Sequence, residues 1–119
     1  MARILIVEDN PNNMKLATML LEGAGHHVLK AGEAQLGLDI ARTQLPDLVL
    51  MDIQLPGMDG LTATRLLKAD VNTSAIKIFA LTAFAMKDDE EKMRSAGCDG
   101  YIAKPIRYQD FLQKIAAIL

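Results

Sequence analysis

Short, wholly apolar runs alternate along this chain with longer runs in which apolar residues recur at every third or fourth position. Ile4–Val7 and Leu48–Met51 are examples of the short kind, and each ends directly at acidic residues. Uninterrupted apolar runs of this length are typical of strands in a parallel sheet that is covered on both faces. The longer runs have the spacing of amphipathic helices. The pattern therefore predicts strands and helices in alternation.

Five strand–helix pairs are expected, and turn residues help to set their limits. Asn10 and Pro11 supply a helix N-cap and a proline for the first helical turn. The predicted strands are Arg3–Val7, His27–Ala31, Asp47–Met51, Lys77–Leu81 and Gly100–Ala103. The predicted helices are Pro11 to Gly23 or Gly25, Glu33–Thr43, Leu61–Ala69, Met86–Ala96, and one from about Tyr108 that buries Phe111, Leu112, Ile115 and Leu119.

This order of elements predicts an α/β fold. Right-handed crossovers place helices on both faces of a parallel sheet, and a closed barrel would need eight units and about twice this length. We therefore expect a doubly wound (βα)5 three-layer sandwich of the flavodoxin-like type, with strand order 2-1-3-4-5. The length of 119 residues fits a single domain, residues 1–119.

The composition limits both the cellular compartment and the kinds of molecule that the protein is expected to bind. A single cysteine, Cys98, excludes an intramolecular disulfide framework and fits a reducing compartment. The net charge of −2 argues against direct nucleic-acid binding. The apolar runs are too short for a signal peptide or a membrane span. We expect a cytoplasmic protein with no direct nucleic-acid or membrane partner.

The candidate chemistry lies at the strand ends. Glu8 and Asp9 follow the first predicted strand, Asp52 follows the third, and Thr82 and Lys104 follow the fourth and fifth. In open parallel sheets, ligands bind beyond the carboxyl ends of the strands, at the point where the strand order reverses. In the order 2-1-3-4-5 this point lies between the two strands that end in acids. Singly, each residue is more often a helix cap or a loop residue, but their joint placement favours a site.

Three neighbouring carboxylates must be relieved of their mutual repulsion. Two charges about 4 Å apart repel by roughly 4 kcal/mol at an effective dielectric constant near 20, so a proton or a cation is needed. Magnesium prefers oxygen ligands, and with Lys104 it would bring the site near neutrality. A phosphoryl group could then approach, and a carboxylate can accept it as a nucleophile. Asp52, which stands alone opposite the Glu8–Asp9 pair, is the better candidate.

Four motifs together resemble the receiver domain of two-component response regulators, and the resemblance covers the whole chain. The motifs are Ile4–Asn10, Leu48–Gly60, Ala80–Ala83 and Tyr101–Pro105. Shorter strings, Met51–Pro56 and Leu81–Lys87, are further similar to single-domain regulators of the DivK type and to receivers within hybrid histidine kinases.

The resemblance implies roles for the site residues. Asp52 would accept a phosphoryl group from a histidine kinase or a histidine phosphotransfer protein. Asp9, Asp52 and the backbone carbonyl of Gln54 would ligate Mg²⁺, with Mn²⁺ as a possible substitute, and Glu8 would act largely through water. Lys104 would contact the phosphoryl group.

The resemblance also implies a route for the signal. Thr82 would move to hydrogen-bond the phosphoryl group, and Tyr101 would follow by changing rotamer. The Lys104–Pro105 peptide bond is expected to be cis. A downstream protein would bind the fourth helix, fifth strand and fifth helix, at a surface that includes Phe84, Met86, Ile106 and Tyr108. For Phe84 a buried position is the alternative.

Two other classes share parts of this pattern. A magnesium-dependent phosphatase of the haloacid-dehalogenase type would also use Asp52, but it normally carries a second acid two residues later, where this chain has Gln54. A flavin-binding module would need a hydroxyl-rich phosphate loop where this chain has Glu8 and Asp9. We therefore expect a signalling switch that is not a turnover enzyme, either free-standing or as a receiver of a hybrid kinase.

Overall fold

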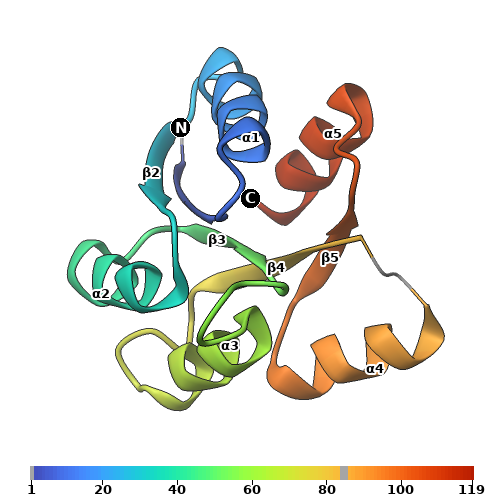
Figure 1. Ribbon diagram of the computed structural model, residues 1–119. Helices are drawn as coiled ribbons and strands as arrows, with labels where there is room; N and C mark the ends of the chain where they lie inside the picture. Colours follow the sequence, from blue (N-terminus) through green and yellow to red (C-terminus); the bar gives the residue numbers. More distant parts are fainter. Residues whose placement is uncertain (1, 84–85) are drawn as a thin grey trace.

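Five strands and five helices alternate in the computed structural model, which describes residues 2–83 and 86–119 (Figure 1). The strands are β1 (Arg3–Val7), β2 (His27–Ala31), β3 (Leu48–Asp52), β4 (Lys77–Thr82) and β5 (Gly100–Ala103). The helices are α1 (Pro11–Gly23), α2 (Ala34–Gln44), α3 (Gly60–Ala69), α4 (Lys87–Ala96) and α5 (Tyr108–Ile118).

The strands form one parallel sheet in the order β2-β1-β3-β4-β5, which confirms the predicted topology. Helices α1 and α5 cover one face, and α2, α3 and α4 cover the other (Figure 1). Alternate side chains of β1 lie on opposite faces of the sheet. Leu5 and Val7 pack beneath α2 and α3, whereas Ile4 and Ile6 pack beneath α1 and α5. The uninterrupted apolar sequence of β1 follows from this two-sided burial.

Most predicted limits hold within one residue, and the differences have local causes. Asn10 caps α1 as expected, since its side chain accepts from the backbone N–H groups of Asn12 and Asn13. Strand β3 begins and ends one residue later than predicted, because Asp52 is still paired in register with Leu81 of β4.

The predicted burial of the last helix is wrong in part. Phe111 and Ile115 are buried in the core, and Leu112 is half-buried against it. Leu119 lies beyond the end of α5 and is 47% exposed. The 3–4 periodicity continues to the last residue, but the helix that would turn Leu119 inward stops at Ile118.

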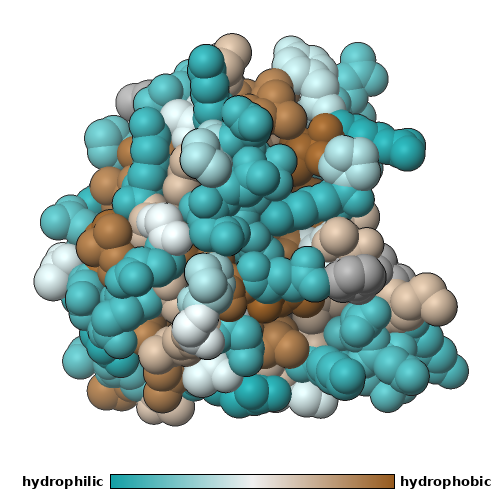
Figure 2. Space-filling view, in the orientation of Figure 1, coloured by the Kyte–Doolittle hydropathy of each residue, from teal (hydrophilic) through white to brown (hydrophobic). Residues whose placement is uncertain are grey.

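The surface shown in Figure 2 is mainly hydrophilic, with apolar residues in separate patches. Among residues 2–83 and 86–119, no helix is long and apolar enough to cross a membrane.

Candidate functional site

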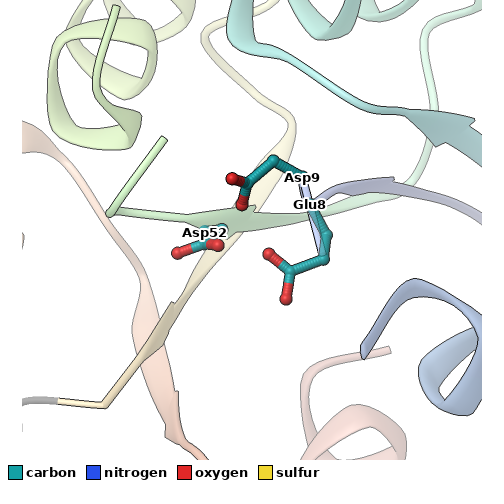
Figure 3. A group of neighbouring side chains, drawn as sticks. All are labelled: Glu8, Asp9 and Asp52. Carbon is teal, nitrogen blue, oxygen red and sulfur yellow. The ribbon is translucent and has the colours of Figure 1, made fainter. Parts of the chain in front are cut away.

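Three carboxylates meet at the carboxyl edge of the sheet, between the central strands (Figure 3). Glu8 and Asp9 follow β1, and Asp52 is the last residue of β3. Because Val7 pairs in register with Met51, the two strands end level with each other. One oxygen from each of the three side chains lies within 4.8 Å of the others. The structure thus brings together the acids that the sequence pattern selected.

The three acids differ in burial. Glu8 is 2% exposed and Asp52 is 4% exposed, whereas Asp9 is exposed to solvent. Lys104 extends from the end of β5 and places its Nζ 2.9 Å from Glu8 Oε1 and 3.1 Å from Asp52 Oδ2. Its backbone N–H donates to the carbonyl of Thr82, and the Lys104–Pro105 bond is cis. One cation is therefore fixed between two buried carboxylates.

The two buried acids have opposite pKa shifts. Burial, and then the neighbouring Asp52 carboxyl group, raise the pKa of Glu8 to about 7, although Lys104 opposes the change. Burial would also raise the pKa of Asp52, but its interactions with Glu8, the Gln54 backbone N–H and Lys104 outweigh this effect, so the pKa of Asp52 is lowered. The negative charge of the pair therefore rests on Asp52, and Glu8 is mainly protonated below a pH of about 7.

The residues present fit a hard divalent cation. Glu8 Oε2 is buried and has no hydrogen-bond partner among the residues that the structure describes. Asp9 adds a solvent-facing carboxylate, and all the side-chain donors of the cluster are oxygens. A buried oxygen without a partner is costly, and an ion held by carboxylates and water would satisfy it.

The loop after β3 holds Asp52 in place. The Gln54 backbone N–H donates to Asp52 Oδ1 at 2.9 Å. Gly60 begins α3 and passes so close to β3 that a Cβ there would lie 2.1 Å from the Asp52 carbonyl oxygen and 2.7 Å from Ile53 Cα. Only glycine allows this approach, so Gly60 is a structural requirement of the site.

Thr82 and Tyr101, the two predicted switch residues, lie on adjacent strands. Thr82 ends β4 and is buried. Tyr101 lies on the edge strand β5 and is half-buried. Its hydroxyl donates to Glu90 Oε1 of α4 at 2.5 Å, and Lys114 Nζ of α5 lies 5.7 Å from the centre of its ring.

Sequence reasoning missed both Glu90 and Lys114. Glu90 belongs to an acidic first turn that the helix dipole alone explains, so nothing in the sequence separates it from its neighbours.

The predicted partner surface is only partly exposed. Met86 and Tyr108 are 72% and 62% exposed, but Ile106 is half-buried against the core beneath α1 and α5. Phe84 lies outside the described residues, so both expectations for it remain predictions.

Comparisons with known proteins agree on one family. Residues 4–116 match the sequence model of the response regulator receiver domain. The polar-differentiation response regulator DivK of Brucella ovis is 47% identical, with 98% of this chain and 94% of the relative aligned; DivK of Brucella abortus strain 2308 gives the same values.

Solved structures share the fold. Chemotaxis protein CheY4 of Vibrio cholerae superposes with a TM-score of 0.95 at 22% identity, over 100% of this chain and 99% of that one. The receiver domain of a sensor histidine kinase from Pseudomonas aeruginosa PAO1 has a TM-score of 0.87 at 38% identity, over 96% of this chain and 93% of that one. That receiver holds a magnesium ion in its active-site cleft.

Proposed function

This chain belongs to the family of response regulator receiver domains, and on that basis we propose that it is a magnesium-dependent switch that is phosphorylated on Asp52. A receiver domain is a signalling module of two-component systems and not a turnover enzyme. The observation that carries the proposal is the position of Lys104 Nζ, which contacts both Glu8 and Asp52 within the acid cluster.

In the proposed reaction an oxygen of Asp52 attacks the phosphorus of a phosphohistidine. The phosphorus–nitrogen bond breaks, its electron pair goes to the imidazole nitrogen, and that nitrogen takes up a proton from solvent. Asp52 suits the role because its lowered pKa keeps it ionised. Lys104 would stabilise the negative charge of the phosphoryl group. Its ammonium already lies 3.1 Å from Asp52 Oδ2 and can donate to a new phosphoryl oxygen.

Asp9, Asp52 and the Gln54 carbonyl would hold Mg²⁺, or Mn²⁺ in its place, with Glu8 acting through water. When bound, the ion supplies positive charge against the oxygens of the transferring group. The magnesium ion of the Pseudomonas receiver supports this assignment. The unpartnered Glu8 Oε2 supports the water-mediated role, because a water bound to the ion could donate to it.

The proposed partners are a histidine kinase or histidine phosphotransfer protein as donor, in the cytoplasm, and a downstream protein as receiver of the signal. Thr82 would move to hydrogen-bond the phosphoryl group, and Tyr101 would change rotamer and turn inward, into the space that Thr82 leaves. The output surface would be α4, β5 and α5, including Phe84, Met86, Ile106 and Tyr108. The exposure of Met86 and Tyr108 supports this surface.

Phosphorylation by acetyl phosphate with Mg²⁺, followed by intact mass and peptide mapping, tests the proposal. We expect wild type to gain one phosphoryl group on Asp52 and Asp52→Asn to gain none. Asp110→Asn, which changes an exposed acid of α5, is the matched control and should behave as wild type. Uptake by Asp52→Asn at the wild-type rate, or no uptake by wild type, would overturn the assignment.

A further inference from the structure

Helices α4 and α5 flank the edge strand β5 (Figure 1), and one residue of each contacts Tyr101. On one side its hydroxyl donates to Glu90 Oε1 of α4 at 2.5 Å. On the other, Lys114 Nζ of α5 lies 5.7 Å from the ring centre, within the range of a cation–π contact. The hydroxyl–carboxylate bond is the stronger of the two, because it is short and its acceptor is ionised, whereas 5.7 Å is near the outer limit of a cation–π contact.

Open space lies on both sides of the ring. A cleft of about 210 Å³ on the α4 side is lined by Tyr101 together with Glu90, Met93 and Cys98, among others. A second cleft, of about 430 Å³ on the α5 side, is lined by Tyr101 and Lys114. The ring is therefore not packed into a single position from either side. Of the two contacts that hold its orientation, the bond from its hydroxyl to Glu90 is the stronger.

The same bond also positions α4. This helix is the most polar of the five, and of its residues Met93 and Ala96 are the buried ones. The charged residues of its first turn do not pack into the hydrophobic core. The bond from Glu90 to Tyr101 therefore ties the first turn of α4 to β5, and a change of the Tyr101 rotamer would release that turn.

We propose that Glu90 is a positioning residue that holds the receiver in its unphosphorylated conformation, by keeping Tyr101 turned outward and the first turn of α4 docked on β5. The inference rests on the proposed function, in which Tyr101 turns inward when Asp52 is phosphorylated. To turn inward, the hydroxyl must leave Glu90. A contact made in only one of two states shifts the equilibrium toward that state. Loss of Glu90 should therefore favour the active conformation before any phosphate binds.

The ionisation of Tyr101 is consistent with this role. The bond to Glu90, then burial, raise the pKa of the Tyr101 hydroxyl above its ordinary value. The phenol stays protonated at physiological pH and remains the donor that the bond requires.

The test compares Glu90→Ala with Glu91→Ala, which removes the neighbouring exposed acid of the same helix turn. Alanine keeps the helix propensity of α4 in both variants. Beryllium fluoride with Mg²⁺ serves as a non-covalent phosphoryl analogue. Its apparent Kd reports the population of the competent state. We expect about tenfold tighter binding by Glu90→Ala, which corresponds to roughly 1.4 kcal/mol, and no change in Glu91→Ala.

A double-mutant cycle separates positioning from a purely structural effect. Tyr101→Phe removes the same hydrogen bond from the other side, so adding Glu90→Ala to it should change the apparent Kd no further. An undiminished tenfold effect in the Tyr101→Phe background would show that Glu90 acts by another route. If Glu90→Ala lowers thermal stability but leaves the apparent Kd equal to that of Glu91→Ala, Glu90 is structural only and the proposal is wrong.

A phosphate-free readout distinguishes failure of this inference from failure of the proposed function. The chain has two tyrosines, so ¹³C-tyrosine labelling in a Tyr108→Phe background gives a single ring signal from Tyr101. We expect Glu90→Ala to move this signal without any phosphoryl analogue. If wild type binds no analogue at Asp52, the proposed function fails, and the ring signal still decides the role of Glu90. An unmoved ring signal overturns that role.

Discussion

The carboxyl group of Glu8 lies in an environment that favours its neutral form. It is 2% exposed, it lies beside Asp52, and one of its oxygens has no described partner. Lys104 contacts the other oxygen but does not prevent the pKa from rising to about 7. In the absence of a metal ion, a proton relieves the repulsion within the acid cluster.

This environment predicts a pH dependence of stability in metal-free protein. Between pH 4.5 and about 7 the folded state keeps a proton on Glu8 that the unfolded state has released. The unfolding free energy should therefore fall as pH rises through this range, by on the order of 2–3 kcal/mol, since one pKa unit corresponds to about 1.4 kcal/mol. The lowered pKa of Asp52 has the opposite sign, but it acts below that acid's ordinary value of 3.8.

Urea denaturation in the presence of a chelator, at about pH 5 and about pH 8, measures the effect. Glu8→Gln cannot titrate and should lose the fall in stability, whereas the exposed control Glu91→Gln should retain it. Saturating Mg²⁺ should also remove the fall in unfolding free energy, because binding of the ion compensates for the ionisation of Glu8. Equal pH dependence in wild type and Glu8→Gln would contradict the assignment to Glu8.

Two buried threonines should respond in opposite ways to the same substitution. Thr18 Oγ1 of α1 is buried and has no hydrogen-bond partner among the described residues, whereas Thr64 Oγ1 of α3 donates to the Gly60 carbonyl at 2.8 Å. An unmade buried hydrogen bond is costly and a made one is favourable. We expect Thr18→Val to stabilise the protein by about 1 kcal/mol and Thr64→Val to destabilise it by about the same amount. Urea denaturation measures both, and changes of the same sign would refute the explanation.

At the scale of elements, the strand pattern was predictable because burial on both faces leaves a continuous apolar sequence. The first and last residues of the strands were less predictable. Asp47 was predicted to begin β3, but its carboxylate instead accepts from the Arg3 N–H just ahead of the strand. Asp52 was placed after β3, but pairing with β4 keeps it in the strand. Such one-residue differences depend on contacts between strands that a single segment of sequence does not encode.

The end of α2 contains a strained residue. Leu45 has a φ of +47° and is 52% exposed. A left-handed conformation costs a non-glycine residue about 1–2 kcal/mol, and glycine is favoured at this position after a helix. We expect Leu45→Gly to stabilise the protein by about 1 kcal/mol. Leu36→Gly, at a 44% exposed position inside the same helix, is the control and should destabilise it by about 1 kcal/mol. Thermal unfolding distinguishes the two, and a destabilised Leu45→Gly would contradict the argument.

The start of α3 is fixed by Gly60, as the distances to the Asp52 carbonyl and Ile53 show. Gly60→Ala should force the backbone of β3 away from α3. We expect a loss of at least about 2 kcal/mol together with weaker Mg²⁺ binding, because Asp52 moves with its backbone. Gly23→Ala, at a helical position with open space around it, should be neutral or slightly stabilising. Isothermal titration with Mg²⁺ and urea denaturation check both effects, and an unaltered Gly60→Ala would show that the loop adapts.

At the scale of the whole molecule, the topology determines which parts of the site could be foreseen. Strands that lie side by side end level, so acids at the ends of β1 and β3 had to meet. The hydrogen bond from Tyr101 to Glu90 depends on how α4 lies beside the edge strand β5. The sequence does not distinguish Glu90 from the other acids in the first turn of this helix. The burial of Glu8 relative to Asp9 was likewise not predictable, since both follow the same strand.

The acid cluster also makes the stability of the whole domain depend on Mg²⁺. An ion that binds the folded chain alone stabilises every element together by mass action, by about 2.7 kcal/mol at a concentration of about 100 times its Kd. For a domain of this size, each kcal/mol raises Tm by roughly 4 °C. We expect Mg²⁺ to raise Tm by about 10 °C in wild type at neutral pH or above and by much less in Asp52→Asn, which removes one ligand charge. Asp110→Asn controls for an exposed acid away from the cluster and should keep the full increase. Equal increases in wild type and Asp52→Asn would place the ion elsewhere on the surface and leave the acid cluster without its proposed cofactor.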